Sequence, residues 1–354
     1  MATVAEIMRD FDGGVGLYTA FTEKTHLLVR EVLSNRNLVI HSVSARTKAR
    51  ASFERKISKV EGRYERVGDV TDIVGIRVIT YFSSDVDRVA NALAQEFTID
   101  DTHSVDKRHI LETDRFGYLS LHSVVSLSAT RLALYEYKQY QGLRAEIQIR
   151  SILQHAWAEI EHDLGYKTAA EIPKPVRRQF SRLAGLLEIA DNEFVSIRNA
   201  LRNYENEVPS RIRMEPESVS LDRASLTAFV NSSAIVREID EQIATFAGGK
   251  ILPMLGTAIE RHLSGLRILG IESVGQLETS LRSRREDLLQ LAAEWLRGRE
   301  ADVNELVSLV YLAYSLLSER GSVELAESFL RASGVEEHRV TSDADIIATY
   351  KRSR

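Results

Sequence analysis

The spacing of apolar residues divides the chain into regions of different texture. Residues 1–66 carry apolar positions at helical spacing, most clearly over Leu17–Leu33, and end in a stretch rich in arginine and lysine. Residues 67–150 change to β-branched runs, which predict short strands around one helix at Val86–Phe97. Residues 151–207 return to a helical pattern. This order predicts an α+β domain with a small mixed β-sheet flanked by helices.

A change in composition marks the end of this domain. Residues 206–220 are polar and hold two of the five prolines, which is typical of a linker. Beyond them the pattern is helical nearly to the C-terminus, with an amphipathic helix expected at Asn304–Leu317. We therefore predict a domain at 1–207, a linker at 208–220 and an all-α domain at 221–354. One apolar face of the last domain suits either an internal core or the covering of a cleft: Leu306, Val310, Tyr311, Tyr314, Leu316 and Leu317.

Composition limits the classes of protein to be considered. The 354 residues are 44% hydrophobic and include no cysteine, which excludes disulfides, thiolate metal sites and cysteine nucleophiles. No run of about 18 apolar residues exists, and the first residues lack a basic segment followed by an apolar one. We therefore expect a cytoplasmic protein with no membrane partner. The formal net charge of −5 still allows a local basic groove.

The most informative stretch is AEIQIRSILQHAWAEIEH, residues 145–162. Its first six residues predict a strand with Glu146, Gln148 and Arg150 on one face, and a helix follows directly. Such a carboxylate suits a metal-binding base beside phosphates, although a solvated strand face is the more common meaning of the pattern. The helix adds three polar residues at i, i+4 and i+7: His155, Glu159 and His162. No HExxH motif or cysteine accompanies them, so we expect structural hydrogen bonds there rather than a metal.

Cations and an acidic residue precede this strand along the chain. Four residues at i, i+4, i+8 and i+11 share one face of a predicted helix: Lys48, Ser52, Lys56 and Lys59. That face is either solvated or a cradle for a polyphosphate. Asp72 opens an apolar strand, where it is either a turn residue or a functional carboxylate. Arg77 lies five residues further on, so strand alternation predicts that it points to the opposite face unless a bulge or twist intervenes.

The segment GYLSLH, residues 117–122, alternates Tyr118, Ser120 and His122 onto one face. A tyrosine ring can stack on a base and a histidine can hold a phosphate or a hydroxyl, but a half-exposed strand gives the same pattern. Other nucleotide-binding and hydrolase motifs are missing: the sequence has no GxxxxGK[ST] loop, no GxGxxG after a strand and no GxSxG.

Several separated motifs occur here in the same order as in the RelA/SpoT nucleotide pyrophosphokinases: RTKARASFERKI, DIVGIR, GYLSLH, EIQIR and HAWAEIEHDLGYK. Over about residues 20–205 the chain resembles the synthetase domain of that family. The resemblance implies that one set of residues binds ATP: Arg46, Lys48, Ser52, Lys56 and Arg77. It implies that Asp72 and Glu146 are catalytic and hold Mg²⁺. It implies that a third set contacts the acceptor: Lys107, Tyr118, His122 and Gln148.

The acceptor side departs from the family pattern. Members that make the alarmone usually read Lys-x-Asn-Gly-Tyr, whereas this chain has Asp114 and Phe116 at the lysine and asparagine positions. Phenylalanine cannot hydrogen-bond a guanine edge, and Asp114 would repel a phosphate.

The resemblance leaves three functions open. The first is synthesis of (p)ppGpp from ATP and GDP or GTP. The second is a toxin that pyrophosphorylates the 3′ end of tRNA and is restrained by its C-terminal domain or by a regulatory protein partner. The third is a catalytically silent nucleotide-binding module. In each case we expect the C-terminal domain to regulate the first domain or bind a partner, and not to supply catalytic residues.

Overall fold

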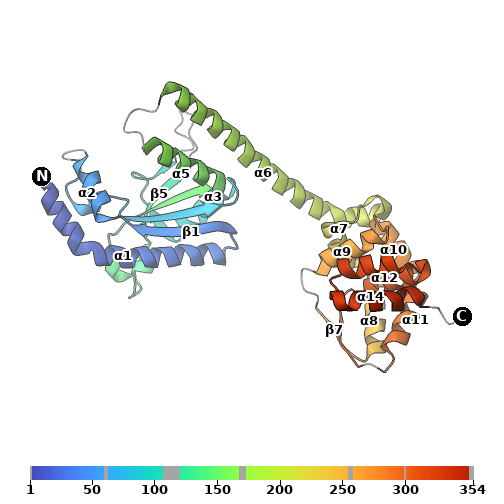
Figure 1. Ribbon diagram of the computed structural model, residues 1–354. Coiled ribbons are helices and arrows are strands. Elements are labelled where there is room, and N and C mark those ends of the chain that lie inside the picture. Colours follow the sequence, from blue (N-terminus) through green and yellow to red (C-terminus); the bar gives the residue numbers. More distant parts are fainter. Residues whose placement is uncertain are drawn as a thin grey trace. The chain divides into compact units, whose positions relative to one another are not determined.

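The computed structural model describes residues 2–59, 63–106, 120–166, 173–253, 258–298 and 300–350. The chain forms two compact units, Met1–Asn199 and Ala200–Arg354, each with its own hydrophobic core (Figure 1). Within the described ranges, no helix combines the length and apolar character needed to cross a membrane.

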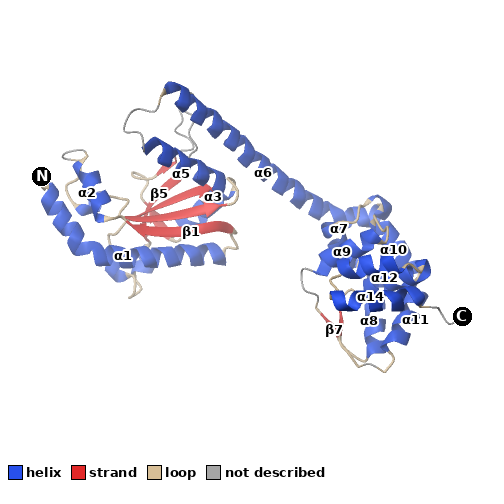
Figure 2. Cartoon of the chain, viewed as in Figure 1, coloured by secondary structure: helices blue, strands red, loops and turns tan. Residues whose placement is uncertain are grey.

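A mixed β-sheet forms the centre of the first unit. Its strand order is β1 (Ile40–Thr47), β2 (Val74–Thr80), β6 (Ala145–Ser151), β5 (Leu121–Leu127) and β3 (Phe97–Ile99), and β4 (Val105–Asp106) also pairs with β5. The neighbours β2 and β6 run parallel, and the other pairs of this sheet run antiparallel. Figure 2 shows the sheet among helices. The predicted α+β class is confirmed.

One face of the sheet is apolar and packs against α1 (Val4–Asn35) and α3 (Asp85–Ala94). Side chains of both helices and of the two central strands share one core: Phe21, Leu28, Val29, Val74, Ile76, Val78, Val86, Val89, Leu93, Ile147 and Ile149. Successive side chains of a strand alternate between faces. The remaining residues of β2 and β6, among them Arg77 and Glu146, therefore lie on the opposite, polar face.

A smaller cluster holds α2 (Arg50–Ser58) beside the first half of α1. The ring of Phe53 is fully buried and stacks on Phe11, with ring centroids 4.1 Å apart. Ile73, which leads into β2, belongs to the same cluster. This packing fixes α2 and the start of β2 at one end of β1, and so it positions the polar residues that these segments carry.

The helical prediction for residues 1–66 is wrong at β1. This segment pairs with β2 from Ile40 opposite Thr80 to Thr47 opposite Val74. The segment is a strand because it pairs with β2, whose side chains are buried. Local spacing of apolar residues does not reveal this pairing. Lys48 consequently lies between β1 and α2, so the basic residues expected on one helix face come from two segments.

The strand predicted at Ala145–Arg150 is confirmed as β6, and α5 (Ile152–Tyr166) follows it directly. The helix predicted at Val86–Phe97 is confirmed as α3, which ends at Ala94. Short elements complete the unit: η1 (Val67–Asp69), α4 (Ala129–Leu132) and η3 (Lys138–Tyr140).

The long helix α6 (Lys174–Met214) differs from the predicted linker at 208–220. The chain stays helical to Met214 and continues into η4 (Pro216–Ser218). Val208 and Ile212 are buried in the core of the second unit. These apolar residues, one helical turn apart, keep the helix intact around Pro209, although proline removes one backbone hydrogen bond.

The second unit is helical, apart from a pair of two-residue strands, β7 (Ile251–Leu252) and β8 (Val303–Asn304). Its helices are α7 (Arg223–Ser232), α8 (Ala234–Ala247), α9 (Ala258–Ile268), α10 (Val274–Ser283), α11 (Arg285–Leu296), α12 (Val307–Arg320), α13 (Val323–Ala332) and α14 (Glu337–Thr349). Leu306, Leu316 and Leu317 lie in the core of this unit. Of the two uses expected for this apolar face, the structure shows the internal core.

Candidate active site

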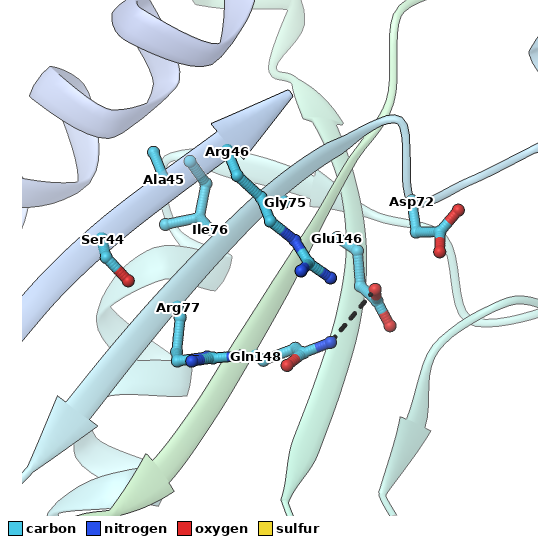
Figure 3. Close-up of a pocket in the computed structure, with 9 residues that line it drawn as sticks. All are labelled: Ser44, Ala45, Arg46, Asp72, Gly75, Ile76, Arg77, Glu146 and Gln148. Carbon is cyan, nitrogen blue, oxygen red and sulfur yellow. Dashed lines mark hydrogen bonds between the residues drawn. The ribbon is translucent and has the colours of Figure 1, made fainter. Parts of the chain in front are cut away.

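Three neighbouring strands bring polar side chains together on the face away from the core. Arg46 of β1 lies opposite Gly75 of β2, and Gly75 lies opposite Glu146 of β6. The next row places Arg77 opposite Gln148. These residues line a cavity of about 110 Å³ (Figure 3), together with Asp72, Ser44, Ala45 and Ile76.

The missing side chain at Gly75 gives Arg46 its path over the sheet. Figure 3 shows the Arg46 side chain lying across β2 toward Glu146. A Cβ atom at position 75 would lie 3.6 Å from Cγ and 3.7 Å from Nε of Arg46, which is van der Waals contact. An alanine would therefore touch the Arg46 side chain, and a larger side chain would compete with Arg46 for this space.

Asp72 lies just before β2 and accepts hydrogen bonds from two lysines. Its Oδ2 lies 2.7 Å from Nζ of Lys48 and 2.9 Å from Nζ of Lys56. Burial raises the pKa of Asp72, but the hydrogen bonds and charges of the two lysines outweigh burial and leave the pKa below its ordinary value. The carboxyl group is therefore ionised at neutral pH.

Asp72 and Arg77 line the same cavity, so the predicted opposite placement of these residues is wrong. Strand alternation does not apply to the pair, because β2 begins at Val74 and Asp72 lies in the turn before it.

Glu146 is held by two hydrogen-bonded chains of residues, one for each carboxylate oxygen. Its Oε1 lies 2.7 Å from Nδ1 of His122, whose Nε2 lies 2.6 Å from Oγ of Ser120. Its Oε2 accepts from Nε2 of Gln148 at 3.3 Å, and Arg150 donates to Oε1 of Gln148 at 2.7 Å. Burial raises the pKa of Glu146, but the hydrogen bond and charge of His122 outweigh burial and lower it overall.

Arg77 reaches the helix that follows the central strand. Its NH1 lies 2.9 Å from Oε1 of Glu159 on α5. On the same helix, burial and then the charge of Arg77 lower the pKa of His155. A histidine that is neutral at this place adds no cation to the site. Among the described residues, no group of three or more histidine, aspartate or glutamate side chains is placed to hold a metal ion.

The structure brings together most of the predicted site. Arg46, Asp72, Arg77, Glu146 and Gln148 line one cavity, Lys48 and Lys56 bind Asp72, and His122 contacts Glu146.

Of the remaining predicted residues, one lies elsewhere and two lie outside the described residues. Ser52 is exposed on α2 and does not line the cavity. Lys107 and Tyr118 lie outside the described residues, as do Asp114 and Phe116. The roles predicted for these residues remain predictions.

Three contact residues were not assigned to the site from the sequence. Ser120 and Arg150 form the outer links of the two chains to Glu146, and Glu159 pairs with Arg77. The two-residue spacing of Ser120 and His122, and of Arg150 and Gln148, was a visible signal. Nothing in the sequence indicated the contact between Glu159 and Arg77, which depends on how α5 packs on the sheet.

The two carboxylates fit a magnesium ion. Oδ1 of Asp72 is buried and has no hydrogen-bond partner among the described residues. The charge of Asp72 raises the pKa of Glu146, so the two carboxylates are close enough to repel each other. Magnesium in proteins takes one or two carboxylates, with waters and substrate phosphates as its other ligands. A cation between Asp72 and Glu146 would satisfy the buried oxygen and relieve the repulsion.

Two carboxylates and two arginines on one cavity, with two lysines bound to one of the carboxylates, are typical of an enzyme of the phosphoryl-transfer class. Residues 45–171 match the family model described as "Region found in RelA / SpoT proteins". The chain is 30% identical over 166 residues to GTP pyrophosphokinase YwaC of Bacillus subtilis (strain 168). The aligned region covers 45% of this chain and 75% of YwaC. It is 31% identical over 169 residues to GTP pyrophosphokinase YjbM of the same organism, covering 46% of this chain and 74% of YjbM.

Among solved structures, the small alarmone synthetase 1 from Bacillus subtilis is similar, with 25% identity, a TM-score of 0.46, and coverage of 55% of this chain and 98% of that one. The chain belongs to the RelA/SpoT family and is a pyrophosphokinase of that type. The resemblance inferred from the motifs is confirmed. The family-model match ends at residue 171, before α6.

Proposed function

We propose that this enzyme transfers the β,γ-pyrophosphate of ATP to the 3′-hydroxyl of GDP or GTP and so makes (p)ppGpp. The observation that carries the proposal is the cavity in which Asp72 and Glu146 face Arg46 and Arg77, with Lys48 and Lys56 bound to Asp72. The names of the relatives, both GTP pyrophosphokinases, support a guanosine nucleotide as acceptor.

The ATP-binding half of the proposed site consists of the two arginines of the cavity and the two lysines bound to Asp72. ATP carries its negative charge on the triphosphate, and fixed cations stabilise it there and in the transition state. Arg46 lies over Gly75 and Arg77 is braced by Glu159 at 2.9 Å, so both guanidinium groups are held in position. Lys48 and Lys56 are held by their hydrogen bonds to Asp72. Ser52 stays in the proposal only as a family-based assignment.

Asp72 and Glu146 would hold Mg²⁺, which when bound neutralises charge on the phosphates of the transferred group. Glu146 is also the proposed proton acceptor. The 3′-oxygen of the acceptor forms a bond to the β-phosphorus, the bond from that phosphorus to the α,β-bridging oxygen breaks, AMP leaves, and the hydroxyl proton passes to Glu146. The hydrogen bond and charge of His122 lower the pKa of Glu146 and keep it ionised, the state in which it can accept that proton.

Transfer to the 3′ end of tRNA is the second candidate. It is favoured by Asp114 and Phe116, which replace the lysine and asparagine of alarmone-making members. A single assay decides between the two: purified enzyme with γ-labelled ATP and Mg²⁺ is given GDP, GTP or bulk tRNA in parallel. We expect label in guanosine tetra- or pentaphosphate; label in tRNA alone would refute the first proposal and support the second. Matched reactions with Glu146→Gln identify label that does not come from this site.

A further inference from the structure

A continuous hydrogen-bonded chain crosses two antiparallel strands. It runs from the hydroxyl of Ser120 through both ring nitrogens of His122 to the carboxylate of Glu146. The contacts are 2.6 Å from Ser120 Oγ to His122 Nε2, and 2.7 Å from His122 Nδ1 to Glu146 Oε1. Only 9% of Ser120 is exposed. We propose that Ser120 is a positioning residue that fixes the ring of His122 and, through it, the carboxylate of Glu146. This inference rests on the proposed role of Glu146.

Donor and acceptor roles along the chain are constrained by chemistry. An ionised carboxylate only accepts hydrogen bonds, so Nδ1 of His122 carries the hydrogen in its contact with Glu146. In the neutral ring, Nε2 is then an acceptor, and the partner that donates to it is the hydroxyl of Ser120. In the neutral ring Ser120 thus selects the tautomer that can hold Glu146; in a charged ring Nε2 donates to the Ser120 hydroxyl instead, and the hydroxyl still fixes the ring beside Glu146.

If the Ser120 hydroxyl is removed, no other described group takes its place as hydrogen-bond partner of His122 Nε2. The other tautomer, or a flipped ring, becomes accessible: the other tautomer turns the lone pair of Nδ1 toward the carboxylate, and the flipped ring turns the Cδ2–H group toward it, so both lose the N–H···O hydrogen bond. Glu146 would then keep only the 3.3 Å contact with Gln148, which is the longer of its two hydrogen bonds. The carboxylate would gain rotational freedom where the reaction requires a fixed direction.

The hydrogen-bonded chain from Arg150 through Gln148 explains why loss of the Ser120 hydroxyl should affect the rate of the reaction and not ATP binding. Arg150 is 7% exposed and donates to Gln148, so the other carboxylate oxygen remains held from its own strand when Ser120 is changed. The cations of the ATP half lie on β1, on β2, in the loop before α2 and on α2, and none of their described contacts involves Ser120. Loss of the Ser120 hydroxyl should therefore lower kcat and leave the KM for ATP nearly unchanged.

The test compares Ser120→Thr with Ser120→Val, two variants of nearly equal shape that differ in the hydroxyl. Residues beyond the first ligands of a metal site typically contribute about 10- to 100-fold to activity or affinity. We expect Ser120→Val to lose about 10-fold or more in kcat with the KM for ATP within about twofold, and Ser120→Thr to keep most of the wild-type kcat. The control is Ser126→Ala, which removes a hydroxyl from the same face of β5 at a distance from Glu146.

A second measurement does not depend on turnover. Nitrogen chemical shifts of ¹⁵N-labelled His122 distinguish the two neutral tautomers. The inference expects the Nδ1–H form in the wild type and in Ser120→Thr, and a mixture or the Nε2–H form in Ser120→Val and Ser120→Ala. It is overturned if the valine variant keeps the wild-type kcat, if threonine and valine lower kcat equally, or if the tautomer is the same in all variants. Should Glu146→Gln itself remain active, the proposed function fails instead, and the tautomer data still decide the role of Ser120.

Discussion

Nδ1 of His122 lies 2.7 Å from Oε1 of Glu146, across the antiparallel pair β5 and β6. Burial raises the pKa of the glutamate and this contact lowers it by more, so the carboxyl group is ionised at neutral pH. Two residues from different sequence motifs therefore form one hydrogen-bonded pair in the site. The charged carboxylate lines the same cavity as Arg46 and Arg77, and a buried ionised group in such a place is typical of a functional site.

The first prediction concerns Glu146→Gln, which keeps the shape and removes the charge. Loss of a general base typically costs about 10²- to 10⁴-fold, so we expect transfer of the label from ATP to fall by about 10³-fold. The unfolding midpoint should change little, because glutamine can still accept from His122. Glu136→Gln, an exposed residue of the same unit, is the matched control. Activity within tenfold of the wild type would contradict the catalytic role.

The second prediction concerns Asp72→Asn and magnesium. The amide oxygen can still accept from Lys48 or Lys56, but it no longer balances their two charges. We expect kcat/KM to fall by about 10²-fold or more, and the Mg²⁺ concentration for half-maximal rate to rise. Asp69→Asn is the control, since Asp69 is bound by Arg66 away from the cavity. An unchanged Mg²⁺ requirement at lower activity would argue that Asp72 orients the lysines without binding metal.

The sequence predicted those parts of the site that depend on the alternation of residues along a single strand. The strand carrying Glu146, Gln148 and Arg150 followed from two-residue alternation, because apolar residues between them point into the core. The pairing of Lys48 and Lys56 with Asp72 could not be predicted the same way. It depends on the turn after β1 and on the stacking of Phe53 on Phe11, which places α2. Helical spacing suggested a shared face for the lysines, yet Lys48 is not helical.

The boundary between the units was harder to predict for a related reason. A proline and many polar residues around Asn206 are typical of a linker, and the same residues occur on the exposed side of a long helix. Only the contacts of Val208 and Ile212 with the second core distinguish the two cases. Tertiary packing, which local composition does not encode, therefore determined the outcome.

The third prediction concerns the acceptor and uses sequence alone. Asp114 and Phe116 stand where alarmone-making members have lysine and asparagine. We expect the double variant Asp114→Lys/Phe116→Asn to increase the rate with GDP relative to bulk tRNA, because it adds a cation for a phosphate and a hydrogen-bonding group for guanine. A change of about tenfold in the ratio, corresponding to about 1.4 kcal/mol, is a reasonable size for two such contacts. A ratio that stays constant would show that these positions do not select the acceptor.

The fourth prediction concerns pH and the second unit. Burial, and then the charge of Arg261, lower the pKa of His262 to about 4 from its ordinary value of 6.5. The unfolded chain therefore binds a proton more readily than the fold, so stability is full above pH 6.5 and is lost as the pH falls toward 4. Between pH 7.5 and pH 5 this loss is at most about 2 kcal/mol.

Urea unfolding of the second unit, followed by the fluorescence of Trp295 in a Trp157→Phe background, measures this loss. The free energy of unfolding of His262→Gln should depend less on pH over the same interval. His338→Gln, at an exposed histidine of the same unit, should behave as the parent. Equal pH dependence in the parent and in His262→Gln would refute the assignment.

The last prediction concerns the second unit, for which we propose regulation or partner binding without catalytic residues. All the residues that line the described cavity, and those that bind Asp72 and Glu146, lie in the first unit. A truncation should end at Asn203, because Tyr204 packs against the core of the second unit and would be exposed in a longer fragment. Asp191 and Arg198 keep α6 attached to the first unit through hydrogen bonds to Ser151 and Asp85.

We expect the fragment 1–203 to fold, as judged by circular dichroism and a single unfolding transition, and to transfer label from ATP at no less than about a tenth of the full-length rate, a loss of at most about 1.4 kcal/mol. A rate higher than that of the full chain would indicate an inhibitory second unit. The fragment carrying Glu146→Gln is the control for background label. A folded fragment without transfer activity would show that the second unit completes the active site, and the proposal of a purely regulatory role would be wrong.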